Sequence, residues 1–143
     1  MREQTIEDEV LGTLTWNKSV NCWGGETEIM PGHTISVTVL AEDTPLATVL
    51  EGARPLFQRL RADEPALRQA AADGLLARYN STWNDGPPLD SATFMAQIAL
   101  NGFAAYEDGS AEINYDDGDL FWGHTITVSI DANGAFQDVG ING

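Results

Sequence analysis

The fold of this chain is decided by two stretches with one pattern, Gly32-His33-Thr34-Ile35-Ser36-Val37-Thr38-Val39 and Gly123-His124-Thr125-Ile126-Thr127-Val128-Ser129-Ile130. Polar and apolar residues alternate in both, which predicts β-strands with one face in the core and the other in solvent. Short alternating strands draw on few residue types, so we interpret the likeness as convergence rather than duplication. The chain therefore has strands in its first and last thirds.

The residues between these strands are typical of helices. Thr44 precedes Pro45, so we expect Thr44 to be the N-cap and Pro45 the first helical residue. Pro55 lies inside the apolar pattern, where it should kink this helix or divide it in two. Asp63 is expected to cap a second helix, and Asp90 or Ser91 a third, shorter one. The apolar stripe of the first helix consists of Leu46, Val49, Leu50, Ala53, Phe57 and Leu60.

The last third returns to strands that meet at tight turns. Asp108-Gly109 and Asn133-Gly134 are strong hairpin signals, and such short connections require antiparallel pairing. Strands, helices and then strands predict an α+β fold, an antiparallel sheet built from N-terminal and C-terminal strands with two to three helices (about 45–98) packed on one face. We expect one domain over residues 1–143, with strands in 1–43, helices in 44–98 and an antiparallel meander in 99–143.

The formal net charge of −15 is unevenly distributed. Residues 46–100 carry six acids against five arginines, whereas residues 101–143 carry eight acids and neither Lys nor Arg. Such a surface repels the phosphates of nucleic acids and of anionic membranes, and it attracts a cationic protein. We therefore expect a cationic protein partner, no nucleic acid and no membrane. Acidity that serves solubility alone is the alternative.

Cysteine and apolar content set the expected compartment. The single Cys22 has no partner for a disulfide within the chain, and no stretch reaches the length of a membrane span, ~20 apolar residues. The acidic N-terminus lacks the apolar run of a secretory signal. These features predict a cytoplasmic protein.

Three aspartates, Asp116, Asp117 and Asp119, crowd one turn of the last third. They lack the spacing and the closing glutamate of an EF-hand calcium loop. Aspartate and glycine favour tight turns because they tolerate positive φ and bond to nearby backbone groups. We interpret the cluster as a turn, and we expect neither a metal nor a cofactor.

His124 follows this turn and, with Asp117 or Asp119, could form the base of a small hydrolase. No nucleophile elbow and no glycine-rich loop before a helix accompanies it. His33 and His124 each follow a glycine at a strand start, so a structural role for both stays open. Phe121-Trp122 lies between the aspartates and His124, and alternation predicts one ring in the core and the other outside. An exposed aromatic residue beside carboxylates is typical of a binding surface.

The run from Tyr115 to Ile126, with the closing residues Asp138 to Gly143, resembles the bacterial family catalogued as domain of unknown function 2262. Tyr79-Asn80-Ser81-Thr82-Trp83 and Gly109-Ser110 are also similar to that family's pattern, so the resemblance covers about residues 45–143. It implies no established activity. It does imply an association with immunity-protein-like domains, which neutralise toxins by binding them.

These observations lead to three hypotheses about function. The first is a non-enzymatic protein-binding module, in the form of an immunity-type protein that neutralises a basic toxin. The second is a small hydrolase or ligand-binding domain that uses His124 with Asp117 or Asp119. The third is a structural or self-associating protein, which includes a homodimer. The first hypothesis predicts no catalytic residues, and its candidate binding residues are Asp116, Asp117, Asp119, Phe121, Trp122 and His124.

Overall fold

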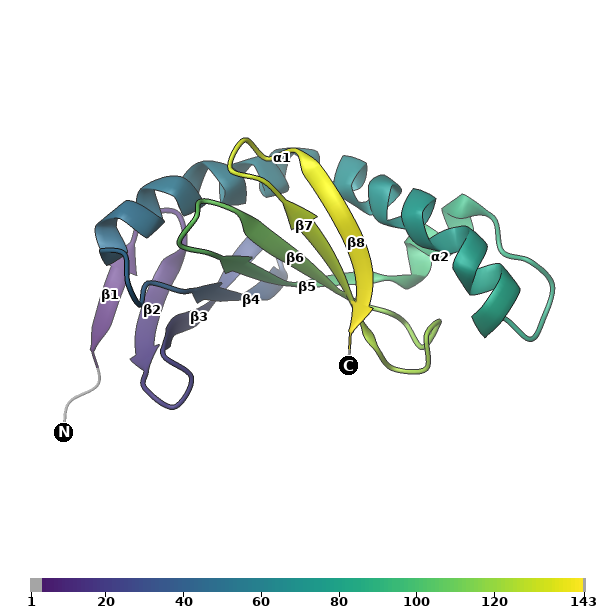
Figure 1. The fold of residues 1–143 in the computed structure, drawn as a ribbon, viewed down its shortest axis with the longest axis horizontal. Helices are drawn as coiled ribbons and strands as arrows, with labels where there is room; N and C mark the ends of the chain where they lie inside the picture. Colours follow the sequence, from purple (N-terminus) through teal and green to yellow (C-terminus); the bar gives the residue numbers. More distant parts are fainter. Residues whose placement is uncertain (1–3, 143) are drawn as a thin grey trace.

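The computed structural model describes residues 4–142, so the predicted domain ends, residues 1–3 and 143, lie outside it. Eight strands form one sheet in the order β1 to β8, with a helical layer along one side (Figure 1). The strands of the first half are β1 (Thr5–Asp8), β2 (Gly12–Asn17), β3 (Cys22–Met30) and β4 (His33–Val39). Those of the second half are β5 (Ala99–Ala105), β6 (Ala111–Asp116), β7 (Thr125–Ile130) and β8 (Phe136–Asn142).

The sheet consists of two antiparallel meanders joined by one parallel pair. β4 pairs with β5 in parallel, with Ser36 opposite Gly102 and Val39 opposite Ala105, whereas every other described pair is antiparallel. A parallel connection needs a long crossover, and here the crossover is the whole helical layer. The α+β prediction is confirmed, but the purely antiparallel sheet was wrong at this central junction.

The turn predictions hold in the second meander. Gly109 and Gly134 have φ of +89° and +82°, which glycine adopts without steric cost. Each sits in a connection closed by a backbone hydrogen bond, from the Tyr106 amide to the Ser110 carbonyl and from the Asp131 amide to the Ala135 carbonyl. The predicted Asp108-Gly109 and Asn133-Gly134 hairpins are therefore confirmed.

The helical layer contains α1 (Leu46–Arg78), one turn of π-helix, η1 (Tyr79–Trp83), and α2 (Ser91–Gln97). α1 runs along the sheet in Figure 1. Its backbone is non-helical only at Asp63, with φ −121° and ψ 21°, two residues before Pro65. The predicted break at Pro55 is wrong: the backbone there is helical, and the kink lies at Asp63 instead.

The three N-cap predictions have different outcomes. The helical backbone is interrupted at Asp63, as expected for the start of a second helix, although the interruption is a kink within α1. Asp90 caps α2, and its carboxylate accepts the Thr93 amide at 2.8 Å. Thr44 does not cap α1, which begins at Leu46 after Pro45 without a side-chain cap. The Thr44 hydroxyl instead donates to Glu107 at 3.3 Å. Glu107 also accepts the backbone amides of residues 42 and 43, and this carboxylate therefore joins the start of the helical layer to the β5–β6 turn.

The core lies between α1 and one face of the sheet. The alternate residues of the two stretches that decide the fold are buried there, and Val37, Val39, Ile126 and Val128 have no exposed surface. α1 contributes Phe57, Leu60 and Leu75, which are equally buried. No helix of the described residues covers the opposite face of the sheet. No helix in the described part of the chain is long and apolar enough to cross a membrane.

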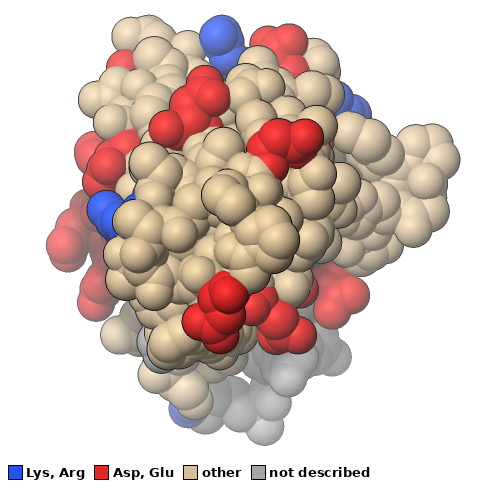
Figure 2. All heavy atoms as spheres, turned by 90° about the vertical axis from the view of Figure 1, so that its right-hand side faces the viewer, with Lys and Arg blue, Asp and Glu red and all other residues tan. Residues whose placement is uncertain are grey.

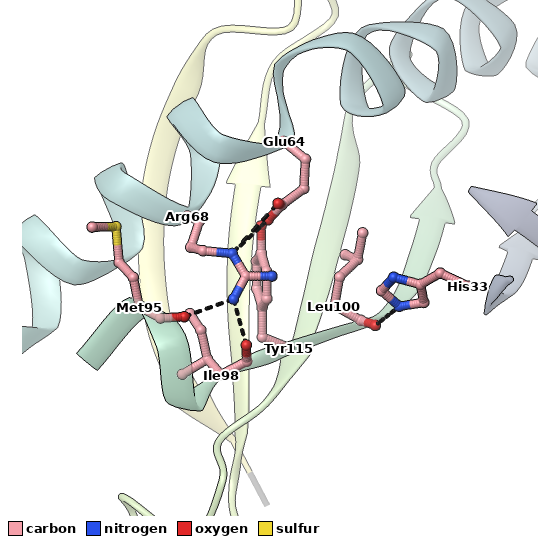
Figure 3. Close-up of polar contacts among 7 residues, drawn as sticks. All are labelled: His33, Glu64, Arg68, Met95, Ile98, Leu100 and Tyr115. Atoms are coloured by element: carbon pink, nitrogen blue, oxygen red, sulfur yellow. Dashed lines mark hydrogen bonds and ion pairs between the residues drawn. The ribbon is translucent and has the colours of Figure 1, made fainter. Parts of the chain in front are cut away.

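A buried polar cluster joins α1 to α2 and to β6 (Figure 3). Arg68 contacts the Glu64 carboxylate at 3.0 Å and donates to the carbonyl of Met95 at 2.7 Å and to that of Ile98. The Tyr115 hydroxyl donates to the same carboxylate at 2.7 Å. Burial, together with this bond, raises the pKa of Tyr115. Because the charged groups are paired and the carbonyls accept the remaining donors, the cluster is a structural junction.

Candidate functional site

The turn between β6 and β7 is organised by one buried carboxylate. Asp117 has no exposed surface, and its two oxygens accept four backbone amides, those of Asp119, Phe121, Gly123 and His124, at 2.9–3.1 Å. A carboxylate that accepts several amides holds the donors in one arrangement, since each such bond is charge-assisted. Asp117 therefore fixes the shape of the whole connection.

The amides bonded to Asp117 hold an unusual backbone in place. Asp119 and Trp122 have φ of +67° and +60°, and so lie in the left-handed region although neither is glycine. Gly118 has φ of +58°, and a Cβ there would lie 2.3 Å from the carbonyl oxygen of Gln97. Only glycine fits at that position. The turn is thus a fixed platform packed against the end of α2.

Trp122 projects from this platform into solvent. Its exposed fraction is 69%, whereas the adjacent Phe121 is fully buried. The predicted division of this pair into an inner and an outer ring is confirmed. Phe121 packs edge-on against the rings of Tyr79, Phe94 and Trp83, with centroids 5.4–6.1 Å apart. The buried ring anchors the turn and leaves its neighbour outside.

The Trp83 ring packs against the exposed indole of Trp122 and supports it. The Trp83 and Trp122 centroids lie 4.7 Å apart at 66°, and the Trp83 ring also contacts the rings of Phe121 and His124. Trp83 was not among the candidate binding residues predicted from the sequence, so this role was missed. No local pattern signals it, because Trp83 comes from η1 and meets Trp122 only through the packing of the helical layer.

His124 has the environment of a positioned structural residue. It is half-buried, its Nδ1 is bonded to the Phe121 carbonyl, and its ring contacts Trp83 with centroids 5.5 Å apart. Asp117 accepts the backbone amide of His124 and not a ring nitrogen. The imidazole is thus oriented by a carbonyl, which gives the predicted hydrolase pair no carboxylate–imidazole contact.

The six predicted binding residues divide into two groups. Asp116, Asp119 and Trp122 are exposed and His124 is half-buried, so they are available to a partner. Asp117 and Phe121 have no exposed surface, and their prediction as contacts is corrected: the first holds the backbone and the second anchors it. We call the exposed residues Asp116, Asp119 and Trp122, supported by Trp83, the Trp122 corner.

The surroundings of the Trp122 corner are acidic. Residues 101–143 contain no Lys or Arg, so this half of the sheet offers no internal cation to pair with Asp116 or Asp119. Figure 2 shows the end of the molecule on the right of Figure 1, with carboxylates spread over a mostly uncharged surface and the few Lys and Arg side chains near its outline. Among the described residues no group of three or more His, Cys, Asp or Glu side chains is arranged to hold a metal ion.

Comparison with known proteins places the chain in a family. The model of the family described as "Uncharacterized protein conserved in bacteria (DUF2262)" matches residues 8–141, which extends the resemblance from residues 45–143 to the stretch from the end of β1 to β8. No curated protein and no solved structure matches the chain. Because the match covers the sheet, the helical layer and the Trp122 corner together, the chain belongs to the bacterial DUF2262 family.

Proposed function

We propose that this protein is a non-enzymatic, cytoplasmic binding module for a cationic protein, and that Trp122 is the anchor of the interface. Asp116 and Asp119 lie beside the anchor and provide negative charge. The kind of partner is a basic toxin, as expected for an immunity-type protein.

The exposure of Trp122 carries the proposal. A tryptophan that is 69% exposed leaves a large apolar surface in water, and a non-glycine residue at φ +60° is held in a conformation it does not prefer. The bonds to Asp117 hold the turn in this conformation, in which Trp122 is exposed and its backbone has a positive φ. A strained conformation of this kind points to a function, and tryptophan is the side chain most enriched among residues that dominate binding energy.

The rigidity of the turn favours binding. An anchor whose backbone is already fixed loses little conformational entropy when it enters a partner's pocket. The Trp83 ring under the indole also limits its movement. Because binding loses less conformational entropy when such a residue is already ordered, a small surface can contribute a large share of the affinity.

The charge of the chain favours a cationic partner in particular. A net charge of −15 produces a long-range field that accelerates encounters with positively charged proteins and slows encounters with acidic ones. The field is screened over about 8 Å at physiological ionic strength. Binding should therefore weaken as salt rises.

Affinity capture from the native bacterium tests the proposal. The wild-type chain should retain a protein with a basic isoelectric point that high salt releases, and Trp122→Ala should lose it. Phe136→Ala is the matched control, because Phe136 is an exposed aromatic residue, at 39%, on β8 and away from the corner. Retention of the same protein by Trp122→Ala, an acidic captured protein, or no capture at all would each contradict the proposal. Size-exclusion chromatography of the sample distinguishes a captured second copy of the chain from a partner.

A further inference from the structure

The uncovered face of the sheet carries charge of one sign. Inward and outward residues alternate along the paired stretches of the strands, and the register places Glu26 beside Ser36 and Glu112 beside Ala104 on the outward side. No described strand contains Lys or Arg. The charged side chains of this face are all carboxylates, and they are Glu7, Glu26, Glu28, Glu112, Asp116 and Asp138.

The arginines lie on the opposite side of the sheet. The five arginines within residues 4–142 all come from α1, and their described partners keep them there. Arg54 binds Asp8 at 2.8 Å, Arg68 binds Glu64, and Arg61 donates to the Ile29 carbonyl at 2.8 Å. The molecule thus separates its charges across the sheet, with arginines in the helical layer and only acids on the uncovered face.

A depression lies at the centre of the uncovered face. It is lined by Ser36, Thr38, Asn101, Gly102, Ala104 and Asn114, at the parallel junction of β4 and β5 and on the adjacent β6. Its floor is low because glycine and alanine occupy β5, and a Cβ on Gly102 would lie 3.4 Å from Asn114 Nδ2. Hydroxyl and amide oxygens surround this floor, and Glu26 and Glu112 stand on the strands that flank it.

The Asn114 side chain at its edge belongs to a short polar ladder. Thr127 donates to Asn114 Oδ1 at 2.9 Å, and Asn142 donates to the Thr127 hydroxyl at 2.8 Å. These bonds run across β6, β7 and β8 on the uncovered side. They hold the amide in one orientation, so the edge of the depression is ordered before any ligand arrives.

Size and charge together indicate what covers this face. Eight strands ~4.8 Å apart, each about six residues long at ~3.3 Å per residue, make a face of roughly 38 Å by 20 Å, or about 760 Å². A specific protein interface covers ~800 Å² on each partner, so the face is large enough for one. A surface that carries only carboxylates complements a basic partner and repels a second copy of itself.

We propose that the uncovered sheet face docks the cationic protein and that the central depression receives one arginine side chain of that partner, between Glu26 and Glu112. This inference rests on the proposed function. The guanidinium offers five donors in a plane. The hydroxyl and amide oxygens of the depression accept some of them, and the two glutamates provide the opposite charge.

The test uses nona-arginine as a probe and the ¹H–¹⁵N spectrum of the full chain. At low salt the peptide should shift the amides of Ser36, Thr38, Gly102 and Asn114 more than those of α1. Glu26 is exposed, whereas Glu112 is half-buried and accepts a hydrogen bond from the Tyr106 hydroxyl. The double variant Glu26→Gln, Glu112→Gln should bind the peptide about fivefold more weakly than wild type, since each charge pair at the surface contributes a modest share. Nona-lysine should produce smaller shifts at the same amides, because an ammonium group cannot form the forked contacts of guanidinium.

The matched control is Glu51→Gln, Asp73→Asn, which removes two exposed carboxylates from α1. It should change the affinity by less than about twofold, because neither residue faces the peptide. Equal weakening in the two double variants, or shifts spread over α1, would overturn the proposal. Shifts of the same four amides on dilution without peptide would show that a second copy covers the face, and would overturn it too.

The outcome is separable from that of the Trp122 experiment. With the captured protein as ligand, Trp122→Ala tests the anchor and Glu26→Gln, Glu112→Gln tests the sheet face. Loss of binding in the first with full binding in the second would refute docking on the sheet and leave the anchor in place. Failure to capture a basic protein would refute the proposed function whatever the peptide does.

Discussion

Replacing Asp117 with alanine removes the acceptor of four backbone amides at once. These belong to Asp119, Phe121, Gly123 and His124. The bond to Phe121 is buried, whereas the other three are part-buried. Water can therefore reach three of the four donors after the substitution, but it cannot easily reach the Phe121 amide.

The expected cost follows from that division. A buried amide left without an acceptor costs about 1–3 kcal/mol, and each lost bond that water partly replaces costs about 0.5–1 kcal/mol. The sum for Asp117→Ala is about 2.5–6 kcal/mol, a large part of the ~5–15 kcal/mol that stabilises a typical domain. Asp117→Asn keeps one acceptor oxygen and should cost about 1–2 kcal/mol.

Urea unfolding followed by far-ultraviolet circular dichroism measures these costs. Asp116→Asn is the matched control, because Asp116 is exposed at the adjacent position, and it should remain within about 0.5 kcal/mol of wild type. A loss below about 1 kcal/mol for Asp117→Ala would refute the reasoning, since four amides would then be satisfied without their carboxylate. Equal losses for the Asp116 and Asp117 variants would refute it as well.

Two further predictions concern buried ionic groups. Burial opposes ionisation of Asp8, but the bonds from Arg54, Leu11 and Val10 outweigh it and lower the pKa of Asp8 below 3.8. The stabilisation is therefore present above the unfolded-state pKa of about 3.9 and is lost as pH falls through the lower folded-state pKa. Asp8→Asn should accordingly make the decline of stability in urea titrations below about pH 4 shallower than in wild type, and an unchanged decline would contradict this. In the Figure 3 cluster, Tyr115→Phe should reduce the free energy of unfolding by about 2 kcal/mol because Glu64 loses a buried donor. Arg59 forms a pair with Asp63 at 4.0 Å, and both side chains are more than half exposed. Arg59→Ala should therefore cost less than about 0.5 kcal/mol. Thermal or urea unfolding of both variants checks the order, and equal costs would show that burial of the cluster adds nothing.

Patterns within short segments were sufficient for much of the fold. The alternation in residues 33–39 and 123–130 predicted two strands whose apolar positions are now seen in the core. Asp90, Gly109 and Gly134 were predicted from turn and cap chemistry, which depends only on neighbouring backbone groups. The opposite sides of Phe121 and Trp122 were also predicted, although the pair lies in the turn that Asp117 holds and not in a strand. Each of these features is local, so the residues concerned are enough to specify it.

The remaining features depend on residues far apart in the chain. The parallel β4–β5 pair exists because the whole helical layer separates two meanders that then share one sheet. The kink of α1 falls at Asp63 and not at Pro55, a choice that the local proline signal did not predict. Trp83 reaches Trp122 only through the packing of the helical layer. Such contacts are selected by the burial of the combined core, which no short window of sequence contains.

The sequence by itself determined that this is an acidic chain of strands, helices and strands, with an aromatic pair after a cluster of aspartates. Only the tertiary structure decided how those aspartates divide. Asp117 turns inward because the backbone of residues 119–124 offers it four amides, and Asp116 and Asp119 are left outside. Only the structure showed that the carboxylates of the described strands lie on the face opposite the arginines, with Asp8 as the exception. The cause is the same in both cases: a charged group is stable in the interior only where partners converge on it, and convergence is a property of the folded chain.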